Sequence, residues 1–319
     1  MKDKMKLSVN NREGTLIITI AVIFVAMCIL KGELFYARSN IEAIFSNLAY
    51  DLLLACGMTF VILTGGIDLS VGSILGLAGV LASGILESTG NAGAAILVAL
   101  AVGIGCGAVN GFFVAVCEIP PFISTLGMMT LLRGCILVYT KGSPIPIKVD
   151  AYKFFGKGTV AGVPVPVIIL IILFLIAHYV LTQTSYGRSI YAFGGNREAA
   201  RLSGISVRFT EWMAYTLNGL MCGVAGVILT ARLGSAQSTS GTGIEMDAIA
   251  AVILGGTSLS GGVGFVLPTV VGAMIMGIID NILTLMNVNP HATNIVKGAV
   301  ILIAVLVDKK VKDLSAKAE

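Results

Sequence analysis

Residues 92–116 read AGAAILVALAVGIGCGAVNGFFVAV and contain no charged side chain. An α-helix rises about 1.5 Å per residue, so a run of this length can cross the roughly 30 Å hydrocarbon core of a bilayer. Within the run, Gly103, Gly107 and Gly111 recur at every fourth position. This spacing lets two helices pack closely in lipid. The stretch therefore predicts a membrane-spanning helix with closely packed neighbours.

The composition of the whole chain agrees with a membrane protein. The chain has 319 residues, of which 56% are hydrophobic and 12% are charged, and its mean hydropathy is +0.95. Soluble domains typically carry about 25% charged residues. A water-soluble enzyme, a disordered segment and a nucleic-acid-binding protein are therefore poor fits. The 39 glycines favour close-packed membrane helices over a soluble core.

Apolar runs recur along the chain, and most are close to the length that crosses a bilayer. They fall at about 15–32, 48–66, 70–88, 92–116, 119–140, 163–182, 211–232, 247–259, 265–287 and 291–307. We therefore predict an all-α, polytopic membrane protein with about ten transmembrane helices. The eighth run is short and ends in glycine and serine, so it fits the pattern least well.

Basic residues set the expected orientation. Residues 1–14, 183–210 and 308–319 each hold four Lys or Arg residues, which favours the cytoplasmic side for all three segments. Even numbers of predicted spans separate these segments, as a shared side requires, provided that the short eighth run crosses. The loop 141–162 carries four lysines and disagrees, but three clusters outweigh one.

The expected organisation follows from these spans. Residues 1–14 form a cytoplasmic N-terminal segment, residues 15–307 a transmembrane domain with the cytoplasmic loop 183–210, and residues 308–319 a cytoplasmic tail. The first run follows a basic stretch, as a signal peptide does, but no small-x-small cleavage site comes after it. We therefore expect an uncleaved first span.

Signatures of enzymes are missing. No G-x-x-x-x-G-K-[ST] loop, G-x-S-x-G elbow or H-E-x-x-H pair occurs, so we do not expect an enzyme or an ATP site of that kind. The six cysteines lie in or beside apolar runs without a C-x-x-C pair, and the two histidines are far apart. This pattern indicates buried thiols, with no metal site and no cofactor.

Some charged residues lie in or near the apolar runs, where burying a charge costs several kcal/mol. They are Asp51, Asp68, Arg133, Asp280 and Lys297. Such side chains either line a cavity and pair across helices, or lie at span ends where they reach interfacial water. Arg133 is deep in its run, and we expect a buried pair there.

The loop 183–210 contains the signals of a short helix over residues 197–203. Asn196 can cap it, and Glu198 lies in the first turn, where the helix dipole favours an acid. Gly204 suits the left-handed position that ends a helix. The helix lies on lipid headgroups or docks a soluble partner. The segment consists of Asn196, Arg197, Glu198, Ala199, Ala200, Arg201, Leu202, Ser203 and Gly204.

Two glycine-rich stretches are similar to each other. Residues 65–72 read GGIDLSVG, and residues 255–262 read GGTSLSGG. Each follows a span that we expect to run from outside to inside. A related pair of interrupted spans often marks the binding site of a transporter. The match is short, so chance similarity is the alternative.

Four ordered motifs resemble those of permease subunits of ribose-type ABC importers, in the superfamily of monosaccharide permeases. They are GGIDLSVGS at 65–73, LLRG with VYTKGSP within 131–144, GGNREAARLSGI at 194–205 and DAIAAVILGGTSLSGG at 247–262. The similarity covers about residues 47–308. It implies a pore of two permease copies, or two related permeases, in the inner membrane. It also implies a cytoplasmic ATPase docked on helix 197–203 and an extracytoplasmic sugar-binding protein.

Within this resemblance, we expect the two interrupted spans to line an alternating-access pathway for a monosaccharide. The candidate residues can offer polar groups to a sugar or let the backbone approach it. They are Gly65, Gly66, Asp68, Ser70, Gly255, Gly256, Thr257, Ser258 and Ser260. The alternative is that these motifs only end helices and hold a gate. Similarity favours ribose or a related pentose as the substrate.

Two other classes of function stay open. A secondary transporter coupled to protons through Asp51 or Asp280 would work without an ATPase or a docking helix. A structural or sensory membrane protein would use its polar residues only to hold helices together, and it would move no solute.

Overall fold

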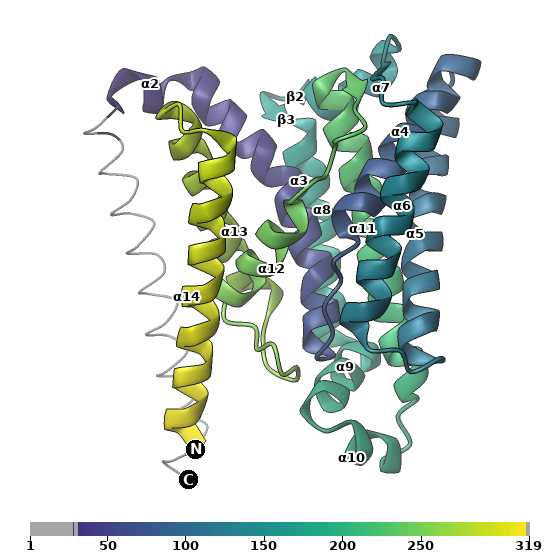
Figure 1. Cartoon of the computed structure of the whole chain (residues 1–319), viewed down its shortest axis with the longest axis vertical. Helices are drawn as coiled ribbons and strands as arrows, with labels where there is room; N and C mark the ends of the chain where they lie inside the picture. Colours follow the sequence, from purple (N-terminus) through teal and green to yellow (C-terminus); the bar gives the residue numbers. More distant parts are fainter. Residues whose placement is uncertain (1–27, 29–30, 317–319) are drawn as a thin grey trace.

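The structure, a computed structural model, describes residue 28 and residues 31–316. It is a bundle of long helices that run roughly along one axis (Figure 1). The helices are α2 (Glu33–Tyr36), α3 (Arg38–Leu63), α4 (Val71–Thr89), α5 (Ala92–Ala115), α6 (Pro121–Thr140), α7 (Asp150–Lys157), α8 (Val165–Gln183), α9 (Ser185–Gly195), α10 (Arg197–Leu202), α11 (Val207–Leu233), α12 (Ile244–Leu254), α13 (Val266–Leu285) and α14 (Pro290–Ala316).

Four two-residue strands form two small antiparallel pairs. β1 (Ile145–Pro146) pairs with β4 (Ser235–Ala236), and β2 (Thr159–Val160) pairs with β3 (Val163–Pro164). The strands and α7 lie at one end of the bundle, which we name the α7 end (Figure 1). The short helices α9 and α10 lie at the opposite end, named the α10 end.

The predicted class of an all-α, multi-span membrane protein is confirmed. Seven of the described helices are long and apolar enough to cross a membrane: α3, α4, α5, α6, α8, α11 and α13. The last predicted run, 291–307, falls within α14, which spans the height of the bundle (Figure 1). The first predicted run, 15–32, falls almost wholly outside the described residues, as do residues 1–14 and the last three of the tail.

The eighth predicted run, 247–259, does not form one full-length helix. Its helix, α12, ends at Leu254 and has only 11 residues. The non-helical residues 234–243 before it carry the chain from the α7 end to about mid-height, where α12 begins (Figure 1). The glycines and serines of this stretch have low helix propensity, which explains why the crossing is interrupted.

A second interrupted crossing runs in the opposite direction. Residues 64–70 rise from the α10 end without helical structure, and α4 then begins near mid-height (Figure 1). The starts of α4 and α12 touch there: a Cβ atom on Gly72 would overlap the carbonyl oxygen of Gly241, and the reverse is also true. Only glycine lets the two backbones approach so closely.

Small residues also bring α5 and α11 together, as the four-residue spacing predicts. A Cβ atom on Gly103 would lie 2.9 Å from Cα of Gly223, and one on Gly107 would lie 3.0 Å from Cα of Gly219. The Trp212 indole nitrogen of α11 donates a hydrogen bond to the Ala108 carbonyl oxygen at 3.0 Å. Because α11 also packs against α3, α4 and α7, it is the central helix of the larger group.

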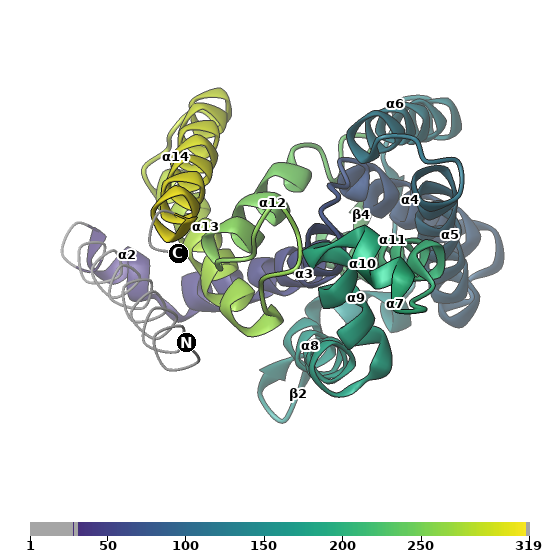
Figure 2. The same ribbon diagram turned by 90° about the horizontal axis from the view of Figure 1, so that it is seen from below.

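Seen along the bundle axis, the helices form two groups joined by α3 (Figure 2). One group contains α12, α13 and α14, and the other contains α4, α5, α6, α8 and α11. On one side of the molecule, α14 and α6 stand apart, and α12 with the segment 234–243 lies between them (Figure 2). The interrupted crossings therefore lie where the two groups meet.

Candidate functional site

The structure brings the two glycine-rich motifs together at the α10 end. The backbone nitrogen of Gly262 donates a hydrogen bond to the carbonyl oxygen of Leu63, just before the first motif, at 2.9 Å. A Cβ atom on Gly65 would lie 3.5 Å from the carbonyl oxygen of Ser260. Sequence similarity between the motifs thus corresponds to direct contact in space.

Gly194, near the end of α9, completes this contact. A Cβ atom there would overlap both the carbonyl oxygen of Leu63 and the backbone nitrogen of Gly262. The side chain of Tyr191 in α9 donates a hydrogen bond to the Gly264 carbonyl oxygen at 2.8 Å. Because α10 follows α9 directly, α10 is connected to both motifs through the contacts of α9.

Asp68 of the first motif is the centre of a buried hydrogen-bond network. Its Oδ1 accepts hydrogen bonds from the backbone nitrogen of Ser70 at 2.9 Å and from the hydroxyl of Ser70 at 2.6 Å. Its Oδ2 accepts one from the side-chain amide of Asn218 in α11 at 2.9 Å. Asn110 of α5 donates to the Ser70 hydroxyl oxygen at 2.7 Å. Asp68 therefore ties the interrupted segment to α5 and α11.

Most of the predicted pathway residues lie inside the protein, but Gly65 and Ser260 are exposed. Asp68, Ser70 and Thr257 are 0% exposed, and Ser258 is 5% exposed. Within the second motif, the backbone nitrogen of Ser258 donates to the Val263 carbonyl oxygen at 2.8 Å, and Gly256 has the positive φ of 90°. Such packing favours the alternative that the motifs end helices and hold a gate. Contact of these residues with sugar stays a prediction.

The short helix predicted at 197–203 is present as α10 (Arg197–Leu202). The Asn196 side-chain oxygen caps it by accepting from the Ala199 backbone nitrogen at 2.9 Å, and Gly204 has φ of 80°. Arg201 pairs with Glu198 at 2.6 Å, and its hydrogen bonds and charge lower the pKa of Glu198. The acid is therefore ionised at neutral pH.

The exposed surface of α10 carries one large apolar side chain, that of Leu202. Leu202 is 75% exposed, whereas Ala200 is 3% exposed and packs inward. A shallow cavity of about 640 Å³ lies beside the helix, lined by Glu118, Arg197, Glu198, Arg201, Ile205, Ser206, Val207 and Arg208. Sequence reasoning missed Glu118, which pairs with Arg208 at 3.8 Å, because the residue comes from the distant α5–α6 loop.

The expectation of a buried charge pair at Arg133 is wrong in part: the residue is only half-buried, and its hydrogen-bond partner is a backbone oxygen. Its Nη1 donates a hydrogen bond to the Ser240 carbonyl oxygen at 2.8 Å, within the interrupted crossing before α12. A Cβ atom on Gly76 would lie 2.8 Å from that oxygen and 3.6 Å from the guanidinium. The glycine thus leaves room for the contact.

Lys297 and Asp280 form an ion-pair cluster that sequence reasoning left incomplete. The Lys297 ammonium lies 2.7 Å from Asp247 in α12 and 2.9 Å from Asp280 in α13. Both Lys297 and Asp247 are largely buried. Sequence reasoning missed Asp247 because it lies at the start of the short eighth run. The cluster fastens α14 to its neighbours, so Lys297 is not merely a span-end charge in interfacial water.

Similarity to known proteins extends over nearly the whole chain. The family described as "Branched-chain amino acid transport system / permease component" matches residues 40–305. Ribose import permease protein RbsC of Escherichia coli strain K12 is 48% identical over 91% of both chains. The RbsC protein of Bacillus subtilis strain 168 is 46% identical over 90% of both.

The name of a third relative gives a different sugar. The D-allose transport system permease protein AlsC of Escherichia coli strain K12 is 39% identical over 94% of this chain and 92% of its own. No solved structure matches this chain. The chain belongs to the family of permease components of branched-chain amino acid transport systems.

Proposed function

We propose that this chain is the membrane subunit of an ATP-driven importer that carries ribose or a related pentose into the cell. The observation that carries this proposal is the similarity to two ribose import permeases, at 48% and 46% identity over at least 90% of each chain. The allose permease is less similar, at 39%, and so is an L-arabinose permease, at 33%, which favours ribose among these three sugars.

The α10 end is the cytoplasmic side in this proposal. The loop 183–210 that bears α9 and α10 carries four arginines, and short cytoplasmic loops of membrane proteins are rich in basic residues. A separate ATPase docks on α10, whose exposed Leu202 offers an apolar anchor. An extracytoplasmic sugar-binding protein delivers the sugar at the α7 end.

A second copy of the chain covers the side on which α6 and α14 stand apart (Figure 2). Non-helical backbone at membrane depth is tolerated only where it is buried in protein or lines water, and the segment 234–243 lies on this side (Figure 2). A dimer across this face encloses the segment and places a shared passage between the two copies.

The family argues against the proton-coupled alternative. The chain matches the permease component of a transport system over residues 40–305, and such a component works together with separate partner proteins. Asp280, one of the two carboxylates of that alternative, lies 2.9 Å from the ammonium of Lys297 and helps to join α13 to α14.

Uptake of labelled ribose into membrane vesicles that contain this chain tests the function. The ATPase, the binding protein and internal ATP are each supplied or left out in turn. We expect uptake only when all three are present. Uptake by this chain alone under a proton gradient would contradict the proposal, and so would ATP-driven uptake of another solute with none of ribose.

A further inference from the structure

The segment 235–243 exposes polar groups where a membrane protein normally presents apolar ones. It reads SAQSTSGTG, and the side chains of Gln237, Thr239 and Thr242 in it are exposed. The segment begins at β4 near the α7 end and descends to the start of α12 near mid-height (Figure 1). Lipid tails cannot hydrogen-bond such groups, so this surface faces water or polar solute.

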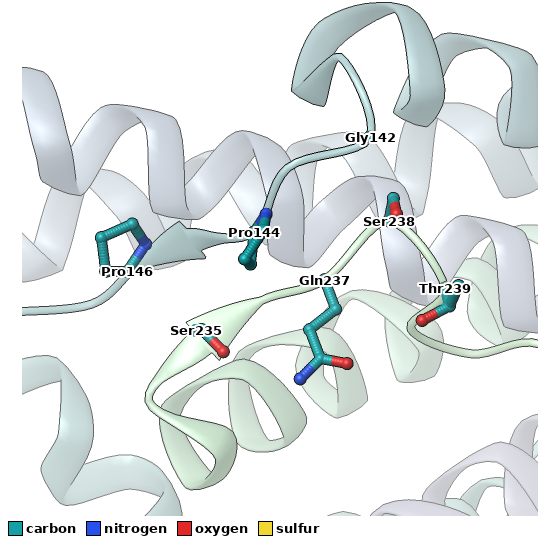
Figure 3. A pocket seen from close by; sticks show the side chains of 7 residues that line it. All are labelled: Gly142, Pro144, Pro146, Ser235, Gln237, Ser238 and Thr239. Atoms are coloured by element: carbon teal, nitrogen blue, oxygen red, sulfur yellow. The ribbon is translucent and has the colours of Figure 1, made fainter.

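A cavity opens at the outer end of the segment. It has a volume of about 470 Å³ and is lined by Gly142, Pro144, Pro146, Ser235, Gln237, Ser238 and Thr239. Figure 3 shows the prolines on one chain segment and the polar side chains on the facing one. The pairing of β1 with β4 and the hydrogen bond from the Ile147 nitrogen to the Gly234 carbonyl oxygen at 2.9 Å hold the two walls together.

The inner end of the segment is closed in this structure. The backbones of Gly241 and Gly72 touch there, and Arg133 donates a hydrogen bond to the Ser240 carbonyl oxygen at 2.8 Å. Glu245, half-buried in the first turn of α12, lies against Gly72, because a Cβ atom on that glycine would come within 2.7 Å of its carboxylate.

The chemistry of the exposed groups selects a class of ligand. Amide and hydroxyl groups of Gln237, Ser238, Thr239 and Thr242 can donate and accept hydrogen bonds without carrying charge. An uncharged compound with many hydroxyl groups satisfies both roles, whereas an ion would need a compensating charge beside the cavity. None of the residues that line the cavity is charged.

We propose that the segment 237–242 lines the outer half of the translocation pathway, from the cavity beside Gln237 to the closed contact of Gly72 and Gly241. This inference rests on the proposed function, and it names the residues along which the sugar would pass. The sugar enters at the α7 end, exchanges hydrogen bonds along the segment and stops at the glycine contact until the bundle opens toward the α10 end. The glycine-rich motifs at 65–72 and 255–262 then act below it as a gate.

Cysteine accessibility in the assembled importer tests whether the segment faces water. Thr239→Cys and Thr242→Cys are each made in a Cys117→Ser, Cys135→Ser background and treated with a membrane-impermeant, anionic thiol reagent. The matched control is Ile171→Cys, an exposed apolar position of α8 (49% exposed) that we expect to face lipid. We expect both threonine positions to react, the control to stay unmodified, and the bound reagent to stop ribose uptake.

A second variant tests contact with the sugar. Gln237→Ala removes one neutral hydrogen-bonding group and should lower the maximal rate of ribose uptake about fivefold, the effect of losing one such bond. Its thermal denaturation midpoint should not change. Gln183→Ala, an exposed glutamine at the end of α8, is the control and should leave the rate unchanged.

The outcomes separate this inference from the proposed function. Threonine positions that react no faster than Ile171→Cys, or that react without loss of uptake, would overturn the pathway while wild-type ribose uptake stands. Absence of ribose uptake by the wild-type importer would overturn the proposed function. The thiol reaction needs no sugar, so it decides in that case too whether the segment faces water.

Discussion

The backbone nitrogen of Gly262 donates a hydrogen bond to the carbonyl oxygen of Leu63 at 2.9 Å. This bond joins the end of the second motif to the residue at the end of α3, just before the first motif, so it connects different halves of the chain. Gly194 of α9 fits against the same two atoms. The contact therefore links both interrupted crossings to the segment that carries α10.

Gly194→Ala should separate the two motifs. The new methyl group would overlap backbone atoms of Leu63 and Gly262, and overpacking of this kind costs about 1–3 kcal/mol. We expect a lower thermal denaturation midpoint in detergent and a loss of ATP-driven ribose uptake. In the adjacent control, Gly195→Ala, the added methyl group meets no atom within 4 Å. Equal behaviour of the two variants would show that the contact is unimportant.

Asp68→Ala should destabilise the bundle. The substitution leaves the side-chain amide of Asn218 without its buried acceptor and removes the partner of Ser70. Each buried donor left unpaired costs about 1–3 kcal/mol. Thermal denaturation of the purified protein measures the effect. The control Asp150→Ala removes an exposed carboxylate paired with Lys153, and it should change stability by less than about 1 kcal/mol.

Lys297→Met should loosen α14. It removes the cation that lies 2.7 Å from Asp247 and 2.9 Å from Asp280, and an unpaired buried charge costs about 3 kcal/mol or more. Adding Asp247→Asn to this variant should restore part of the stability, because one of the uncompensated charges is then gone. If the losses of stability in the two single variants simply added up in the double variant, the ion pair would not account for the instability of Lys297→Met.

Leu202→Asp should uncouple the permease from its ATPase without unfolding it. Leu202 is 75% exposed, so its replacement costs little in the isolated subunit, but an acid there opposes an apolar contact. We expect unchanged thermal denaturation, loss of co-purification with the ATPase and loss of uptake. Ser185→Asp introduces the same charge at an exposed position of α9, and it should keep the ATPase bound.

The structure also shows which substitution is unsuitable for that experiment. Ala200 lies in the same helix and, by sequence, is as good a candidate for the docking surface as Leu202. It is only 3% exposed, and a larger side chain there would disturb the packing of α10. A loss of uptake after such a change would not distinguish failed docking from failed folding.

By itself, the sequence determined the fold class, the long apolar helices and the capped helix at 197–203. These features depend on local properties, namely hydropathy over about 20 residues and the hydrogen-bonding capacity of a few residues such as Asn196 and Gly204. The similarity of 65–72 to 255–262 and the resemblance to sugar permeases were likewise visible, because both are carried by contiguous motifs.

Tertiary structure decided what these motifs touch. Three contacts join residues that are distant in the chain. They are the hydrogen bonds of Gly262 with Leu63 and of Asn218 with Asp68, and the ion pair of Lys297 with Asp247. Local propensity carries no information about such pairs. Only packing of the helices shows that Asp68, Ser70 and Thr257 are buried while Gln237, Thr239 and Thr242 stay exposed, because burial depends on neighbours that the chain supplies from elsewhere.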